Sequence, residues 1–269
     1  MINADIQGAR MALSNDKMNT INRFYVRHVV MLFFCMLLPA TLLADERQDG
    51  LRFSPMVLNY SQADNPSGKS VTISNHSQHV FLLKGSIRAM EAETGRNRKT
   101  EALSSDLVIL PPLSRLEAGG EYTFRIRTVG NNLPKDRESA YIVSITAIPG
   151  ITAQGTPPAT GTLQIAVRMN IRLFYRPTGI PARNNSDVVK KLRFYGNGDR
   201  LSVDNPTPYF IHLNNVSING KNVGQDIMDG FVSPKSTRDF PVKITAEGQI
   251  SWVFGQEKNV HQATITHRQ

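Results

Sequence analysis

Few side chains in this chain are placed to do chemistry. His76 and His79 stand close together in Asn75-His-Ser-Gln-His79, and two imidazoles at that spacing can bind a metal ion. No third ligand accompanies them, and a turn with two histidines alone is usually solvated. No Ser/His/Asp arrangement or paired-carboxylate motif stands out, and the motifs HExxH, GxxxxGK[ST] and GxGxxG are absent. The sequence therefore predicts a protein that is not an enzyme and uses no metal ion or cofactor.

Composition and charge narrow the class of protein further. The 269 residues are 40% hydrophobic and 20% charged, which is enough apolar material for a packed core. The net charge is +9, which could suit an anionic partner, but no run of lysine and arginine is dense enough for a nucleic-acid arm. We therefore expect no nucleic acid partner. The single cysteine, Cys35, excludes an internal disulfide.

The N-terminus has the pattern of a secretory signal peptide. Arg23 and Arg27 precede an apolar run of ten residues, Val29–Leu38, and smaller residues follow up to Ala44. The run is short for a membrane span, although a retained anchor is the alternative. The sequence predicts a signal peptide over residues 1–44, with a possible upstream extension because translation can begin at Met1 or Met18. Cleavage near Ala44 would release the mature chain outside the cytoplasm.

The most informative pattern is an alternating stretch over residues 163–173. Side chains of a strand alternate between two faces, so the odd positions form one apolar ridge, made of Leu163, Ile165, Val167, Met169, Ile171 and Leu173. Eleven residues are more than most strands contain. We expect the C-terminal part of the ridge to line the domain's own core, and the N-terminal part to be available for pairing with another chain.

The elements that position this ridge read as short strands. Runs such as Tyr122–Arg127 and Tyr141–Ile148 alternate or are β-prone, and prolines, glycines and asparagines separate them. The Pro- and Gly-containing tract after Phe174 suits a hinge. Beyond it we expect a second set of strands, among them Phe210–Leu213 and Phe240–Ile244. The sequence predicts an all-β chain of two sandwiches.

Several motifs resemble one protein family. Gln164-Ile-Ala-Val, followed by Ile171-Arg-Leu-Phe-Tyr-Arg-Pro177, is similar to the end of the first domain of PapD-like periplasmic chaperones of the chaperone–usher pathway. Further blocks resemble the family in the same order: Leu110-Pro-Pro-Leu-Ser-Arg-Leu-Glu-Ala-Gly119, Leu133-Pro-Lys-Asp-Arg-Glu-Ser139 and Asp204-Asn-Pro-Thr-Pro-Tyr209. The resemblance covers roughly residues 51–255.

This resemblance implies a fold and a function. The fold is two immunoglobulin-like β-sandwich domains in an L-shaped (boomerang) arrangement, with the N-terminal domain at 45–177, a hinge at 178–181 and the C-terminal domain at 182–269. The function is that of a periplasmic chaperone. It stabilises pilus (fimbrial) subunits by donor-strand complementation and delivers them to an outer-membrane usher. Free chains could also self-associate through the donor strand.

The resemblance also assigns roles to residues. The inserted donor side chains are Leu163, Ile165, Val167 and Met169. Arg172 matches a position that is usually lysine and that binds the terminal carboxylate of the subunit, a role for which arginine is also suited. Glu138 and Arg176 match an interdomain ion pair.

Two positions depart from the family pattern. A first-strand arginine that completes the carboxylate site is missing, because Ser54-Pro-Met-Val-Leu-Asn-Tyr60 has Met56 or Val57 in its place. An aspartate of the interdomain network is also absent, with Gly255 near its expected position. The sequence leaves open which residue replaces the arginine.

Two other functions fit parts of the sequence. A secreted β-sandwich adhesin or surface-binding module would explain the signal peptide and the strands, but it would need neither Arg172 nor the ridge. A structural pilus subunit would usually carry its own N-terminal donor extension and form a single incomplete domain, and neither feature is visible.

Overall fold

A computed structural model describes residues 50–98, 102–130, 132–150, 165–244, 247–255 and 257–267. The predicted signal peptide and Leu163 lie outside the described residues. The chain divides into two units, Met1–Gln48 and Asp49–Gln269, and the structure below is that of the second. Within the described residues no helix has the length and apolar character to cross a membrane.

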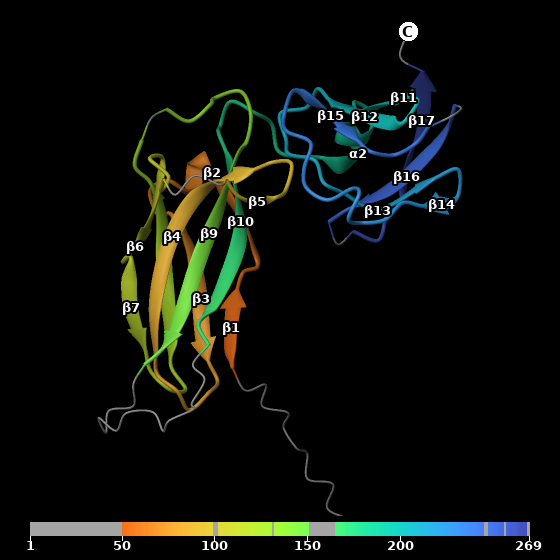
Figure 1. The fold of residues 1–269 in the computed structure, drawn as a ribbon. Coiled ribbons are helices and arrows are strands. Elements are labelled where there is room, and N and C mark those ends of the chain that lie inside the picture. Colours follow the sequence, from red (N-terminus) through yellow and green to blue (C-terminus); the bar gives the residue numbers. More distant parts are fainter. Residues whose placement is uncertain are drawn as a thin grey trace, which may run out of the picture. The chain divides into compact units, whose positions relative to one another are not determined.

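The N-terminal part is a sandwich of two sheets (Figure 1). One sheet has the order β1 (Leu51–Ser54), β3 (Lys69–Asn75), β8 (Glu121–Thr128), β6 (Leu107–Leu110). The other has the order β2 (Val57–Ser61), β10 (Val167–Arg176), β9 (Ser139–Pro149), β4 (Phe81–Glu91), β5 (Arg96–Asn97), and β7 (Leu113–Leu116) also pairs with β4. A 3-10 turn, Gln62–Asp64, follows β2. We call this part the N-terminal sandwich.

The core of the N-terminal sandwich follows from alternation along its strands. In β8, Phe124 and Ile126 are fully buried while their neighbours Thr123 and Arg125 are exposed. These side chains meet Val143 of the other sheet in one apolar cluster. Each sheet therefore contributes its inner face to a shared core.

The C-terminal part is one continuous seven-stranded sheet. Its order is β14 (Lys221–Asn222), β13 (Leu213–Ile218), β16 (Gly248–Phe254), β17 (His261–His267), β11 (Arg193–Asn197), β12 (Arg200–Asn205), β15 (Ser236–Phe240), and the short helix α2 (Asn185–Val189) precedes it. Phe194, Leu201, Phe240, Trp252 and Ile265 come from five of these strands and pack in one buried cluster. The sheet, which we call the C-terminal sheet, therefore encloses a single core.

The all-β prediction is confirmed, but individual strand limits differ. Within the stretch predicted as a strand over 163–173, the described residues begin at Ile165 and form a strand from Val167, which extends to Arg176. Val167 is paired with Ala147 of β9, so Ile165 would stand opposite Pro149, which has no N–H to donate. The extension to Arg176 is supported by pairing with β2.

Two predicted strands of the C-terminal part are also misplaced. In the predicted strand Phe240–Ile244, only Phe240 is in a strand, because β15 ends there and Pro241 cannot continue the ladder. In the predicted strand Phe210–Leu213, Ile211 forms an isolated bridge with Val232, and β13 begins only at Leu213.

A buried asparagine turn occurs once in each part. In the N-terminal sandwich, Asn75 donates to the carbonyls of His79 (2.7 Å) and Glu117 (2.8 Å), and its side-chain oxygen accepts from the backbone N–H of Ser77. In the C-terminal part, Asn205 donates to the carbonyl of Tyr209 (2.8 Å) and accepts in the same way from Thr207. The two turns satisfy loop backbone groups that would otherwise be buried without partners.

Candidate functional site

One edge of β10 is open over half of its length. On one side, β9 pairs with β10 from Val167 to Tyr175. On the other side, β2 pairs with it in parallel orientation, and only from Arg172 to Arg176. Among the described residues, nothing pairs with that second edge from Val167 to Ile171. An open edge presents unpaired backbone N–H and C=O groups that a strand of another chain can use.

The odd side chains of β10 become more exposed toward its beginning. Ile171 and Leu173 are fully buried, which confirms that the C-terminal part of the ridge lines the domain's own core. Met169 is partly buried against that core. Val167 is 46% exposed, and Ile165, just before the strand, is 64% exposed. The apolar ridge thus runs beyond the end of its own core, beside the open edge.

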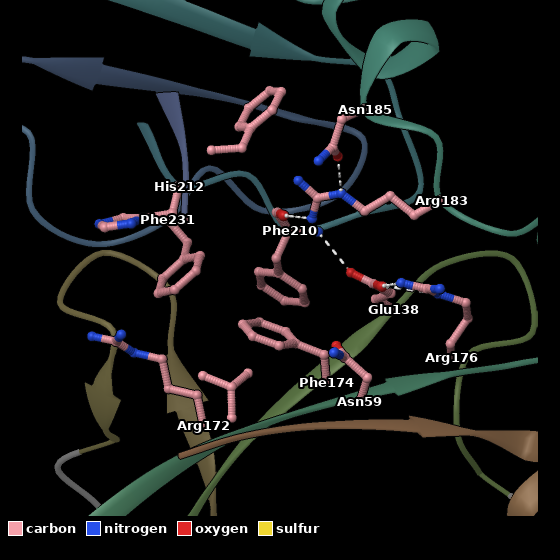
Figure 2. A pocket seen from close by; sticks show the side chains of 13 residues that line it. Asn59, Glu138, Arg172, Phe174, Arg176, Arg183, Asn185, Phe210, His212 and Phe231 are labelled. Carbon is pink, nitrogen blue, oxygen red and sulfur yellow. Dashed lines mark hydrogen bonds and ion pairs between the residues drawn. The ribbon is translucent and has the colours of Figure 1, made fainter. Parts of the chain in front are cut away.

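Three even side chains of β10, Arg172, Phe174 and Arg176, line one side of a pocket of about 490 Å³. Figure 2 shows them opposite Phe210 and Phe231, which come from the C-terminal part of the chain. The pocket therefore combines residues of the N-terminal sandwich with residues of the C-terminal part, among them Phe210 and Phe231 from loops between strands of the C-terminal sheet.

Arg172 stands where the open edge ends. Its register partner in β2 is Val57, which is therefore the residue that faces Arg172, where the sequence left Met56 and Val57 as alternatives. The guanidinium carbon of Arg172 lies 5.3 Å from the centroid of the Phe231 ring. No described residue accepts a hydrogen bond from this guanidinium or forms an ion pair with it. An arginine in such a position is available to an anion.

Glu138 and Arg176, which the family resemblance pairs, are in contact. The guanidinium of Arg176 donates through Nε (3.1 Å) and Nη2 (2.7 Å) to Oε1 of Glu138, whose side chain is 2% exposed. The other carboxylate oxygen of Glu138 accepts from the backbone N–H of Phe210 at 3.0 Å. Glu138 therefore joins a strand of the N-terminal sandwich to a loop of the C-terminal part.

Arg183 is a pocket residue that sequence reasoning missed. Its Nε donates to Oδ1 of Asn185 (2.7 Å) and its Nη1 to the carbonyl of Phe210 (3.1 Å). Its guanidinium carbon also lies 5.9 Å from the ring centroid of Tyr209 and 5.4 Å from that of Phe254. Burial lowers the pKa of Arg183. No motif in the sequence marked this residue, because its partners come from distant segments.

His212 and Phe231 were missed as well. The two rings lie 4.9 Å apart with an interplanar angle of 32°. Burial, and then the positive charge of Arg172, lower the pKa of His212. The alternation Phe210-Ile-His212 places the first and third side chains on one face, which was the available signal for His212, but nothing in the sequence indicated that this face meets Arg172.

A turn of the N-terminal sandwich holds Phe231 in place. The backbone N–H of Phe231 donates to the carbonyl of Ala92 at 2.6 Å. Arg238 donates through Nη1 to the carbonyl of Phe231 (3.1 Å) and through Nη2 to that of Glu93 (2.8 Å). A Cβ on Gly230 would lie only 1.9 Å from the Glu93 carbonyl oxygen, so the backbone approach here requires glycine. These contacts fix the ring on which Arg172 lies.

The described residues contain no group of three or more His, Cys, Asp or Glu side chains that could hold a metal ion. His76 and His79, the pair noted from the sequence, are both exposed in a turn after β3.

Two family models match the chain. The model described as pili and flagellar-assembly chaperone, PapD N-terminal domain, matches residues 50–181. The model described as pili assembly chaperone PapD, C-terminal domain, matches residues 187–254.

Individual fimbrial chaperones are also similar to this chain in sequence. The chaperone protein PmfD of Proteus mirabilis is 32% identical over 206 residues, which cover 73% of this chain and 76% of PmfD. The probable fimbrial chaperone ElfD of Escherichia coli is 38% identical over 128 residues, which cover 48% of this chain and 53% of ElfD.

Solved structures share the fold. A chain in the complex of Salmonella enterica SafA pilin with the SafB chaperone matches with a TM-score of 0.64 and 25% identity, covering 80% of this chain and 96% of that one. The Escherichia coli chaperone DraB matches with a TM-score of 0.62 and 25% identity, covering 80% and 98%. The chain belongs to the PapD-like family of pilus-assembly chaperones.

Proposed function

We propose that this chain holds pilus subunits on the open edge of β10 and delivers them to an outer-membrane usher. The observation that carries the proposal is that this edge, unpaired among the described residues from Val167 to Ile171, ends at Arg172, which no described residue neutralises. An edge that donates backbone hydrogen bonds and ends at a cation suits an extended chain terminus. In one similar structure the chaperone SafB is in complex with a pilin, which supports a subunit as the partner.

The side chains beside the edge supply the apolar contribution. Ile165, Val167 and Met169 would enter a groove of the subunit, together with Leu163, which lies outside the described residues. Burying an aliphatic side chain of this size contributes about 1.5–3 kcal/mol relative to leaving it exposed. Because side chains alternate along the strand, a shift of one residue would turn the apolar face away from the groove, so the ridge also sets the register.

The position of Arg172 selects the direction of the bound strand. β2 begins opposite Arg172 and runs parallel to β10, so it blocks the edge beyond that point. One end of any strand that pairs with the open edge therefore lies beside Arg172. A strand parallel to β10 would bring its C-terminal carboxylate to Arg172, whereas an antiparallel strand would bring its amino end to a like charge. The subunit's last strand therefore binds parallel to β10, with its carboxylate at Arg172.

The proposal also covers export of the chain and its domain boundaries. The family works in the periplasm, so residues 1–44 serve as the signal peptide that brings the chain there. The mature chain consists of an N-terminal domain at 45–177, a hinge at 178–181 and a C-terminal domain at 182–269. Glu138 and Arg176 form the ion pair that links the two domains through Phe210. The role is non-enzymatic, since holding a subunit requires contacts and no bond making.

The proposal is tested by capture from the periplasm. A tagged mature chain is recovered under conditions where pili are expressed, and its bound proteins are identified by mass spectrometry. The wild type is compared with Ile165→Asp and with the control Val260→Asp, whose side chain is equally exposed at 63% but lies far along the chain. We expect wild type and control to carry a small β-rich pilin, and Ile165→Asp to lose it. Capture of no pilin by the wild type would overturn the proposed function.

A further inference from the structure

Four basic side chains line the pocket beside β10: Arg172, Arg176, Arg183 and His212. Two of them are already engaged. The guanidinium of Arg176 is bound to the carboxylate of Glu138. That of Arg183 donates to Asn185 and to the backbone carbonyl of Phe210. Both guanidinium groups therefore already have hydrogen-bond acceptors among the described residues.

The other two, Arg172 and His212, have no side-chain hydrogen bond or ion pair among the described residues, and each lies against the Phe231 ring. The guanidinium carbon of Arg172 lies 5.3 Å from the Phe231 centroid, and the imidazole of His212 lies 4.9 Å from it. The charge of Arg172 acts on His212, which places the two groups within electrostatic reach of each other. Figure 2 shows both beside Phe231, at the same end of the pocket. The two side chains therefore share one aromatic neighbour and one end of the pocket.

The neighbouring strand β2 offers no side-chain hydrogen-bond donor opposite Arg172. Val57 stands opposite Arg172, and its side chain can neither donate a hydrogen bond nor carry a charge. A carboxylate has two oxygens and binds best when both accept hydrogen bonds. The imidazole N–H of His212 is a donor in either protonation state.

We propose that His212 holds the terminal carboxylate of a bound subunit together with Arg172. This inference rests on the proposed function, since it assumes that a subunit carboxylate reaches Arg172. His212, a residue of the C-terminal part, would then supply the hydrogen-bond donor that β2 lacks, because β2 has Val57 opposite Arg172.

The charges around His212 give the interaction a pH dependence. Burial opposes the protonation of His212 most, and Arg172 of β10 and Arg238 of β15 oppose it as well. Asp229, in the loop before β15, favours protonation, but the pKa still lies below its ordinary value of 6.5. A carboxylate brought against the imidazole stabilises the protonated form. The complex therefore takes up a proton that the free chain does not hold. Subunit binding strengthens as the pH falls from the pKa of His212 in the complex toward its pKa in the free chain.

The first arm of the test follows His212 directly by NMR. The Cε1–Hε1 resonance is assigned by its loss in His212→Asn and titrated in the free chain and in the chain's complex with the pilin it captures. We expect the pKa in the complex to be about one unit higher or more, which corresponds to roughly tenfold tighter binding of the subunit by the protonated form. An unchanged or lower pKa in the complex would overturn the proposal.

The second arm measures competition for the pilin between a variant and the wild type at pH 8 and pH 6. We expect His212→Asn to compete several-fold less well at pH 6 than at pH 8, whereas His76→Asn, which alters an exposed histidine in a distant turn, competes equally at both. Equal competition by His212→Asn at both pH values would refute the role of His212 and leave the proposed function standing. The proposed function is overturned by a different result, the capture of no pilin by the wild type.

Discussion

The guanidinium carbon of Arg172 lies 5.3 Å from the centroid of the Phe231 ring. Arg172 belongs to β10, at the end of its open edge, and Phe231 belongs to the C-terminal part of the chain. The cation that the proposal assigns to the subunit carboxylate is therefore positioned by a residue of the other part. This relationship explains why a subunit site on one strand would need both parts of the chain.

Replacing Phe231 by leucine tests this positioning. The variant keeps an apolar side chain in the buried cluster but removes the aromatic face under Arg172. A cation–π contact contributes about 0.5–1 kcal/mol at sites of this kind, so we expect subunit affinity to fall by roughly two- to fivefold. Competition with wild type for the captured pilin measures this, and urea unfolding checks that the fold is intact. Unchanged affinity would mean that the ring does not position Arg172.

Glu138 should matter for stability more than any surface acid. Glu138→Ala leaves the guanidinium of Arg176 without its carboxylate and the Phe210 N–H without its acceptor. Breaking a buried pair costs about 3–5 kcal/mol, and because Arg176 is one quarter exposed we expect about 2–3 kcal/mol in urea unfolding. The matched control is Glu117→Ala, whose ion pair with Arg115 is exposed, and which should leave stability unchanged. Equal losses in both variants would contradict this prediction.

The lowered pKa of His212 predicts how stability depends on pH. Because the pKa in the folded chain is below the ordinary 6.5, the unfolded chain binds more protons just below that pH. The contribution of neutral His212 to the unfolding free energy is present above about pH 6.5 and is lost as the pH falls. We therefore expect the unfolding free energy of the free wild type to fall more steeply between pH 7 and pH 5 than that of His212→Asn. Parallel pH profiles from urea unfolding would show that His212 is not perturbed.

Gly230→Ala tests the backbone contact that holds Phe231. The new Cβ would lie 1.9 Å from the Glu93 carbonyl oxygen, and the residue has a positive φ of +85°. Gly220→Ala is the control, since its φ is +77° but nothing lies within 4 Å of the added Cβ. The control should lose about 1 kcal/mol from backbone strain, and Gly230→Ala clearly more. Equal losses in thermal unfolding would mean that the chain relaxes without cost at Glu93.

The features that could be predicted from the sequence are those that local pattern determines. The alternation through Ile171 and Leu173 predicted which side chains line the core, and the motif blocks predicted the family and with it the fold and function. Family membership gives no support to the adhesin alternative. The start of β10 was wrong because it depends on Pro149 in the neighbouring strand, a pairing that the sequence does not display.

The rest of the site depends on contacts between distant segments. Arg183, His212 and Phe231 carry no motif, and they become pocket residues only because the loops of the C-terminal part meet the even face of β10. The same holds for the Ala92 carbonyl that fixes Phe231. Periodicity identifies which face of a strand is apolar, but it does not identify what lies opposite its polar face.

The central claim is that the open edge of β10 binds the subunit, and amide hydrogen exchange tests it most directly. Exchange is followed by NMR in the free chain and in the complex with the captured pilin. We predict that amides over Val167–Ile171 that point away from β9 exchange rapidly in the free chain and become strongly protected in the complex, while those of β4 change little. If the complex forms and these β10 amides stay unprotected, the subunit binds elsewhere and the account is contradicted.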